Sequence, residues 1–349
     1  MNKRFLIVLG WFTLAVMGVR FFSFAIEYNS DEELGNSFYE KFTELYGVFA
    51  LRIPENLEFA GEQVPLHDPE VFERYDRELL SNTYFQSQGL LYFKRANRYF
   101  PIIEPILKAN GIPDDFKYLA LIESGFMNVV SPAGAAGFWQ FMPVTAKQYN
   151  LEVNDFVDER YHLEKSTLAA CKYLRSAYDK FGSWSLAAAA YNAGSGRIET
   201  SLSKQRVDNY YDLLLNNETS RYVFRILAVK QIMSNPREFG FHFRKKDLYE
   251  PIPVEYEMVD SRIDDLVQFA QERGISYKTL KFLNPWLRNT SLPVSPGKTY
   301  AIAIPKKGAK IHHDGIYDDF PADEREFPGS QNDSVPLDVI PMDNQELND

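Results

Sequence analysis

The sequence of 349 residues contains one cysteine, Cys171, so the chain can form no internal disulfide bond and has no cysteine cluster for zinc. Histidine is also scarce, and the one adjacent pair, His312 and His313, lies in a predicted linker, where we expect no metal site. A surplus of basic charge is lacking too, because the net charge is −10. We therefore expect no metal, no other cofactor and no nucleic-acid partner.

The negative charge is concentrated at the C-terminus. Between Asp314 and Asp349 there are 11 acidic residues and one basic residue, Arg325, so this stretch alone carries a charge of −10 and the rest of the chain is near neutral. Few of its residues are apolar, and prolines are spread along it. This composition predicts a disordered tail over residues 307–349.

The N-terminus has an apolar run that is too short for a comfortable membrane span. The run extends from Phe5 to Val19 and follows Lys3-Arg4, whereas a transmembrane helix needs about 20 residues. Residues 1–25 therefore resemble a secretory signal peptide cleaved after Ala25. The alternative is an uncleaved anchor that runs from Phe5 to Ile26. Both interpretations predict export to the cell envelope (periplasm), with or without membrane anchoring.

Alternation typical of strands is absent before Val254, whereas helical periodicity recurs through the body of the chain. We expect lead-in helices and loops over residues 26–87 and an all-α domain over residues 88–245. Pro101 and Pro105 are expected to kink or split the first helix of that domain. Long-helix periodicity in the same domain places Leu168 on an inward face.

A second, smaller domain is predicted over residues 252–306. Val254–Val259 and Tyr300–Pro305 are expected to be strands, and Arg262–Arg273 and Tyr277–Asn284 are expected to be helices between them. The fold class is therefore mainly α, with a small βααβ unit at the C-terminal end.

Glu123 is the candidate acid. It ends an apolar helix within Tyr118-Leu-Ala-Leu-Ile-Glu-Ser-Gly-Phe126, and apolar surroundings raise the pKa of a carboxyl. A carboxylic acid that is protonated near neutral pH can protonate the leaving oxygen of a glycosidic bond. Two further blocks accompany it: Gly137-Phe-Trp-Gln-Phe-Met-Pro143 and Ala188-Ala-Ala-Tyr-Asn-Ala-Gly194.

A second acid is missing from these motifs, although ordinary glycosidases use two carboxylates. The nearest candidates are Glu152, Asp155, Asp158 and Glu159. We expect Asp158 and Arg160 to form a structural ion pair or cap before the next helix. A site with a single acid suits a reaction whose nucleophile belongs to the substrate.

The three blocks, in this order, resemble the catalytic domain of lytic murein transglycosylases, which has a lysozyme-like fold. Trp139 stands where methionine is common, as in the membrane-bound lytic murein transglycosylase D type, and we expect it to pack in the core. The resemblance implies that the C6 hydroxyl of muramic acid attacks its own C1 in peptidoglycan glycan strands. The product is a 1,6-anhydromuramic acid end, and Glu123 transfers the protons.

The resemblance also implies which residues bind the substrate. Gln140 would bond sugar hydroxyls or N-acetyl groups, Met142 would pack on a pyranose ring, and Ser131 would hold the peptide stem. Its spacing of eight residues from Glu123 differs from the nine that are common in the family. The remaining implied residues line the site from two later blocks: Tyr191, Asn192 and Tyr222.

The C-terminal unit resembles a lysin motif, which implies glycan binding. The likeness rests on Asn284-Pro285 and on the closing strand at Ile302-Ala-Ile-Pro305. Asp260-Ser-Arg-Ile263 stands where that family has Gly-Asp-Thr-Leu. As a separate module, it is expected to add affinity for insoluble peptidoglycan, so that its removal spares cleavage of short soluble glycans.

Two other functions stay open. A goose-type lysozyme or chitinase-like hydrolase would need a second acid to activate water, and the mass of its products would reveal it. A non-catalytic peptidoglycan-binding scaffold is the alternative outside enzymes, and the presence of Glu123 argues against it. The sequence points to no particular protein partner.

Overall fold

The computed structural model describes residues 47–309, so the expected leader, residues 1–25, and almost all of the expected acidic tail lie outside the described residues. The chain divides into two units, Met1–Ile53 and Pro54–Asp349. Residues 47–53, the described part of the first unit, form no helix or strand. All that follows concerns the second unit. None of its described helices is both long enough and apolar enough to cross a membrane.

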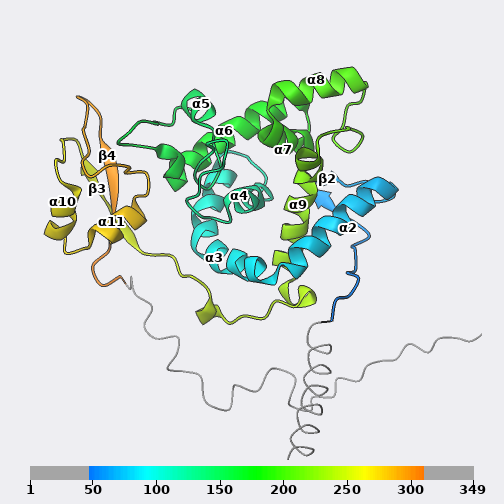
Figure 1. Ribbon diagram of the computed structural model, residues 1–349, viewed down its shortest axis with the longest axis horizontal. Helices are drawn as coiled ribbons and strands as arrows, with labels where there is room; N and C mark the ends of the chain where they lie inside the picture. The colour runs from blue at the N-terminus through cyan, green and yellow to red at the C-terminus, as the bar shows by residue number, and fades with distance from the viewer. Residues whose placement is uncertain (1–46, 310–349) are drawn as a thin grey trace, which may run out of the picture. The chain divides into compact units, whose positions relative to one another are not determined.

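The second unit begins with a small hairpin and continues as a helical body (Figure 1). Its elements are, in order, β1 (Glu58–Phe59), β2 (Glu62–Gln63), α2 (Pro69–Tyr84), α3 (Gln86–Ala109), α4 (Phe116–Ser124), α5 (Pro143–Gln148), the 3-10 turn η1 (Glu159–Tyr161), α6 (Leu163–Phe181), α7 (Trp184–Ala193), α8 (Ser195–Gln205), α9 (Asn217–Ser234), and the 3-10 turns η2 (Pro236–Phe239) and η3 (Lys245–Asp247).

Helix α4 lies at the centre of this body, with α3, α6, α7 and α9 around it (Figure 1). Its residues Phe116, Leu119, Ala120 and Leu121 have no exposed surface, because almost every face of the helix meets another helix. Four alanines of α7, residues 187–190, are equally buried, and their small side chains let α6 and α9 pack closely on both sides. The core therefore surrounds the helix that carries Glu123.

One expectation for the helical body is wrong, and another is met only in part. Leu168 is 41% exposed, because the inward face of α6 is formed instead by Ala170, Cys171 and Leu174. Helix α3 is not split at Pro101 or Pro105 but continues through both, and a kink at these residues stays a prediction. An internal proline costs a helix about 3 kcal/mol, and burial of neighbouring side chains such as Ile103 and Leu107 against the core offsets that cost.

The described residues before residue 88 contain a helix as well as loops, in line with the expected lead-in helices and loops. Helix α2 begins after Asp68, whose carboxylate accepts hydrogen bonds from the backbone N–H groups of Glu70 and Val71. It packs along α9, and its buried Glu78 forms an ion pair with Arg221 of that helix. This helix is therefore part of the helical body.

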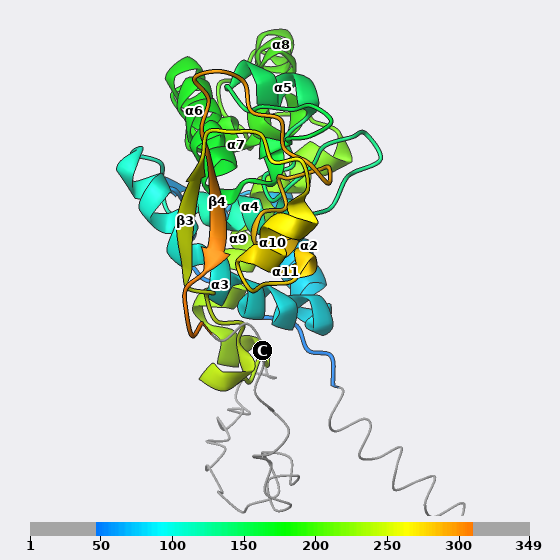
Figure 2. The same cartoon turned by 90° about the vertical axis from the view of Figure 1, so that its left-hand side faces the viewer.

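The C-terminal part of the second unit, residues 254–305, is called the C-terminal unit and has the expected βααβ order (Figure 2). It consists of β3 (Val254–Val259), α10 (Leu266–Glu272), α11 (Tyr277–Leu283) and β4 (Tyr300–Pro305). The two strands pair antiparallel, with Val254 opposite Pro305 and Val259 opposite Tyr300. Helix α10 is shorter than expected, because Asp265 caps its first turn by accepting from the N–H groups of Val267 and Gln268.

Candidate active site

Glu123 sits in the last turn of α4, where the chain turns sharply. Gly125 ends the helix in a left-handed conformation, φ 57°. The hydroxyl of Ser124 donates to the carbonyl of Phe138 at 3.0 Å and accepts from the N–H of Phe126 at 3.1 Å. These bonds fix the end of α4 against the turn that holds Gln140, so the acid and the second motif have a defined spacing.

The Glu123 carboxyl lies among aromatic hydroxyls and accepts a short hydrogen bond from the hydroxyl of Tyr222 in α9. Burial raises the pKa of Glu123 from 4.5 to about 7. The Tyr222 hydrogen bond and the charge of Arg225 oppose this rise in pKa, and the carboxylate of Glu218 adds to it. At neutral pH both the protonated and the ionised forms of Glu123 are therefore well populated.

Tyr222 stays protonated and donates a hydrogen bond to Glu123. Burial, together with the nearby Glu123 carboxyl, holds the pKa of Tyr222 well above its usual value, so the hydroxyl keeps its proton. Burial and the same carboxyl also raise the pKa of Tyr191, whose hydroxyl donates to the carbonyl of Trp139 at 2.7 Å. Tyr191 thereby links the end of α7 to the turn beside Gln140.

The second motif forms a tight turn that carries Gln140 and Met142. Gln140 has a positive φ of 48°, and its side-chain amide nitrogen donates to the carbonyls of Gly137 at 2.7 Å and Val129 at 3.2 Å. Only the amide oxygen of Gln140 is left to accept from a ligand. Met142 precedes α5 and is 41% exposed, which suits contact with a sugar ring.

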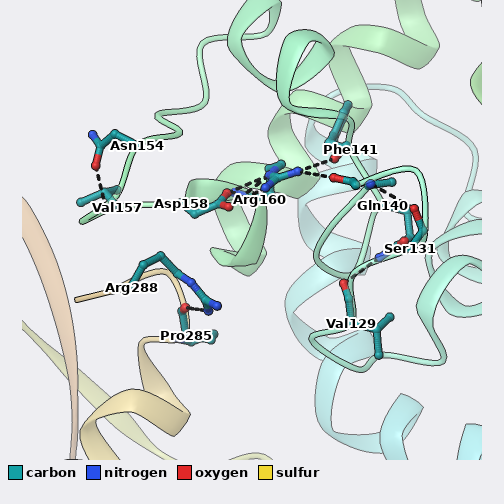
Figure 3. Close-up of polar contacts among 12 residues, drawn as sticks. Val129, Ser131, Gln140, Phe141, Asn154, Val157, Asp158, Arg160, Pro285 and Arg288 are labelled. Atoms are coloured by element: carbon teal, nitrogen blue, oxygen red, sulfur yellow. Dashed lines mark hydrogen bonds and ion pairs between the residues drawn. The ribbon is translucent and has the colours of Figure 1, made fainter. Parts of the chain in front are cut away.

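The two remaining candidates, Asn192 and Ser131, form hydrogen bonds with different parts of the protein. Asn192 donates to Glu218 at 3.1 Å and accepts from the hydroxyl of Thr219 at 2.8 Å, which fixes its side chain at the start of α9. Ser131 closes its own loop, since its hydroxyl accepts from the N–H of Ala135 at 3.0 Å (Figure 3). No hydrogen bond in the described residues joins Ser131 to Glu123 or Tyr222.

Trp139 packs in the core, as expected. It has no exposed surface, and its indole N–H donates to the hydroxyl of Thr167 in α6 at 2.9 Å. It therefore packs on the core side of the turn that carries Gln140, where it is not exposed for contact with a ligand.

Three of the four acids that the sequence offered for activating water form structural hydrogen bonds or ion pairs, and the fourth is exposed. Asp158 accepts from both Nε and Nη2 of Arg160 and caps η1, as expected of a structural pair. Glu159 accepts from Lys165 and from the N–H of Glu152. Glu152 itself accepts from Lys298 and Tyr300, in the C-terminal unit. Asp155 is exposed on the loop between them.

Sequence reasoning missed three residues that act on this site: Ser124, Glu218 and Arg225. Arg225 lies three residues after Tyr222 in α9, and this spacing puts two side chains on one face of a helix. Ser124 directly follows the acid. Glu218 opens the block that contains Tyr222, so all three were adjacent to motifs already recognised.

Comparisons with known proteins agree with these observations. Residues 100–213 match the family model "Transglycosylase SLT domain", and residues 255–308 match "Soluble lytic transglycosylase C-terminal LysM-like domain". The chain therefore carries a transglycosylase SLT domain followed by a LysM-like domain, which confirms the expected fold class. The domain limits 88–245 and 252–306 stay predictions.

Individual relatives are similar over parts of the chain. The membrane-bound lytic murein transglycosylase D of Escherichia coli is 30% identical over 260 residues, which are 72% of this chain and 56% of that protein. The chain thus spans little more than half the length of this relative. The soluble lytic murein transglycosylase of Salmonella typhimurium is 35% identical over 109 residues, 29% of this chain and 17% of that protein.

Among solved structures, the 70 kDa soluble lytic transglycosylase of Escherichia coli matches 44% of this chain and 27% of its own length. The sequence identity is 25% and the TM-score is 0.34.

Proposed function

We propose that this protein is a lytic transglycosylase of the cell envelope. It cleaves the β-1,4 bond between N-acetylmuramic acid and N-acetylglucosamine in peptidoglycan, without water, and leaves 1,6-anhydromuramic acid ends. The observation that carries the proposal is the Glu123 carboxyl in the SLT domain, which has a pKa of about 7 and accepts a hydrogen bond from Tyr222. Export, with or without a membrane anchor, places it beside its substrate.

The first step needs a proton on the leaving oxygen. Protonated Glu123 donates to the glycosidic oxygen as the bond from that oxygen to C1 of muramic acid breaks, and the carboxylate that results is held by the Tyr222 hydroxyl. Arg225, whose charge favours the ionised form of Glu123, stabilises the same carboxylate. The pKa of about 7 makes Glu123 both a usable acid and a usable base.

The second step regenerates the acid. The C6 hydroxyl of muramic acid loses its proton to Glu123 and its oxygen forms a bond to C1, so every proton is accounted for and no water is added. This hydroxyl is held by the substrate itself and has the advantage of proximity over free water. The structural partners of Glu152, Asp158 and Glu159 support this mechanism, because they engage three of the four acids that the sequence offered for activating water.

We propose that the remaining sequence-predicted residues bind the glycan. The amide oxygen of Gln140, the exposed thioether of Met142 and the aromatic ring of Tyr191 are the groups for sugar contacts, and Asn192 contacts an N-acetyl group. Ser131 stays a proposed contact for the peptide stem. The LysM-like domain is proposed to bind glycan strands as well.

The mass of the products tests this function. Purified sacculi digested with the protein should yield muropeptides that end in 1,6-anhydromuramic acid and are about 18 Da lighter than hydrolytic products, because no water is added across the bond. Mass spectrometry separates the two. If only reducing-end muramic acid is found, the protein is a hydrolase of the lysozyme type. Asp155 and Glu218 would then be the first acids to test.

The pH dependence follows from the pKa of Glu123. The free enzyme must carry protonated Glu123 to begin the reaction, and the folded-state pKa is about 7. We therefore expect kcat/KM to be constant below pH 7 and to fall about tenfold per pH unit well above it. Initial rates on a soluble glycan between pH 5 and 9 measure this limb. A limb near pH 4.5 would contradict the raised pKa of Glu123, because 4.5 is the ordinary value for a glutamate.

A further inference from the structure

The segment between α5 and α6 pairs with the LysM-like domain through its backbone. Val157 forms an isolated bridge with Leu287. The N–H of Asp158 donates to the carbonyl of Trp286 at 2.9 Å, and the N–H of Arg288 donates to the carbonyl of Phe156 at 2.8 Å. Figure 3 shows Val157 and Asp158 of this segment facing Pro285 and Arg288. The helical body and the LysM-like domain are thus joined by backbone hydrogen bonds of the kind that pair neighbouring strands.

The two parts also share a hydrophobic core. From the helical body it contains Ala136, Val157 and Tyr161, and from the LysM-like domain it contains Val259, Leu266, Phe269, Ala270, Leu280, Trp286, Leu287, Leu292, Tyr300 and Ile302. The guanidinium of Arg288 lies 4.3 Å from the ring centre of Tyr161. Removal of residues 254–305 would expose the three side chains of the helical body. The expectation that this removal spares cleavage of soluble glycans therefore does not follow from the structure.

Asp158 holds a buried arginine in place. Asp158 and Arg160 are 6% and 8% exposed, and Nε and Nη2 of Arg160 donate to the two carboxylate oxygens at 2.9 and 2.7 Å. The third nitrogen, Nη1, donates to the carbonyls of Gly134 at 2.8 Å and Phe141 at 3.1 Å. Figure 3 shows Arg160 between Asp158 on one side and Phe141 on the other. One guanidinium thus links the two ends of the turn that carries Gln140.

The backbone of the same turn packs directly on Arg160. Gly137 has a φ of +80°, and a Cβ at this position would lie 1.9 Å from the carbonyl oxygen of Arg160. No side chain is tolerated there, which explains a glycine at the start of the Gly-Phe-Trp-Gln block. Arg160 therefore contacts the turn through its side chain at both ends and through its backbone in the middle.

We propose that Arg160 is a positioning residue for glycan cleavage, and that the LysM-like domain holds it there through Asp158 and the strand-like pairing of Val157. The C-terminal domain then has a second role besides glycan binding, which is to fix the geometry of the turn over residues 134–141. This inference rests on the proposed function, because the turn matters for catalysis only through Gln140 and the adjacent Met142.

The variant Arg160→Lys tests the link in the full-length chain. Lysine keeps the charge beside Asp158, but its compact ammonium cannot bind a carboxylate with two nitrogens and also reach two carbonyls. We expect kcat/KM on a soluble glycan to fall between about tenfold and 10²-fold, since a displacement of about 1 Å in a binding element has effects of that size. The pH of the alkaline limb should not move, because Arg160 has no contact with Glu123.

The chain offers a matched control in Arg273 of the LysM-like domain. Arg273 also binds one carboxylate, that of Glu257, with two nitrogens, and donates through Nη1 to a backbone carbonyl, that of Phe269, at 2.8 Å. Arg273→Lys removes the same kinds of bond without touching the turn, so kcat/KM should stay within about twofold of wild type. An equal loss in both variants would show that general destabilisation, not positioning, lowers the rate.

Hydrogen–deuterium exchange tests the link without using activity. The N–H of Ala136 bonds the carbonyl of Phe141, and the N–H of Gly137 bonds that of Val129. Exchange at these amides should be faster in Arg160→Lys and unchanged in Arg273→Lys. Unchanged exchange in Arg160→Lys would refute the positioning role. A wild-type protein that makes no anhydromuramic product would instead refute the proposed function and leave this readout valid.

The contribution of the LysM-like domain is tested by a pair of buried leucines. Leu287 pairs with Val157, whereas Leu280 lies in α11, outside the paired segment, and neither has exposed surface. Leu287→Ala should speed exchange at Ala136 and Gly137 more than Leu280→Ala does, although both substitutions leave a cavity in the same core. Equal exchange rates in the two variants would show that the LysM-like domain does not hold the turn over residues 134–141 in place.

Discussion

Glu123→Gln should reduce cleavage of peptidoglycan by about 10²- to 10⁴-fold or more, because the amide keeps the shape of the side chain but cannot transfer a proton. Binding of glycan should be unaffected, since the groups proposed for sugar contacts lie on α7 and on the turn that carries Gln140. The rate of release of soluble muropeptides and the amount of protein bound to sacculi measure the two effects separately. Activity within tenfold of wild type would remove Glu123 from its proposed role.

The same variant should become more stable than wild type above pH 7. The folded-state pKa of Glu123 is about 7 against an ordinary value of 4.5, so the folded protein holds this proton more tightly than the unfolded chain. Stability is therefore lost as the pH rises from about 4.5 through 7, by at most about 3 to 4 kcal/mol at about 1.4 kcal/mol per pKa unit. Glutamine carries no charge and avoids this loss.

Thermal unfolding at pH 4 and pH 8 checks the sign of this effect. The Tm of Glu123→Gln relative to wild type should be higher at pH 8 than at pH 4. Asp155→Asn is the control, because Asp155 is exposed on the loop before η1 and is not among the charges that shift the pKa of Glu123. It should leave both the rate and the pH dependence of Tm unchanged. A stability difference that does not depend on pH would contradict the buried, raised-pKa carboxyl.

Tyr222→Phe should have the second-largest effect, a loss of about 10- to 10²-fold in the maximal rate. The hydroxyl donates to Glu123 and stabilises the carboxylate that forms after proton donation, and a hydrogen bond to a charged group contributes about 1.5–3 kcal/mol. This bond also lowers the pKa of Glu123. Without it the pKa rises, so the alkaline limb of kcat/KM should move to a pH above 7.

Tyr210→Phe is a matched control for this substitution. Tyr210 is also buried beside α9, where its hydroxyl donates to the carbonyls of Thr219 and Ser220 at 2.9 and 2.8 Å. Its replacement should lower Tm but leave the alkaline limb in place. The pH–rate profiles of the two variants test whether Tyr222 lowers the pKa of Glu123. An unshifted alkaline limb in Tyr222→Phe would mean that the tyrosine only packs beside the acid.

Local patterns in the sequence determined much of this protein. The strands at Val254–Val259 and Tyr300–Pro305 have the expected bounds, because alternation and flanking prolines are local signals. Local signals also placed Glu123 at the end of an apolar helix, and Gly125 ends that helix in the structure. The order of the three motifs was enough to identify the SLT domain.

Only the tertiary structure decided which of these elements meet. Helix α3 passes through two prolines because the core on its inner face outweighs their local cost. The partners Tyr222 and Glu123 are 99 residues apart, and only family resemblance placed Tyr222 at the site, since no periodicity specifies it. The pairing of Asp158 with Arg160 was expected, but nothing in the sequence indicated that Arg160 also bonds the carbonyl of Phe141 or that Leu287 pairs with Val157. Such contacts depend on the directions in which packed elements bring side chains together, and that information exists only in the folded chain.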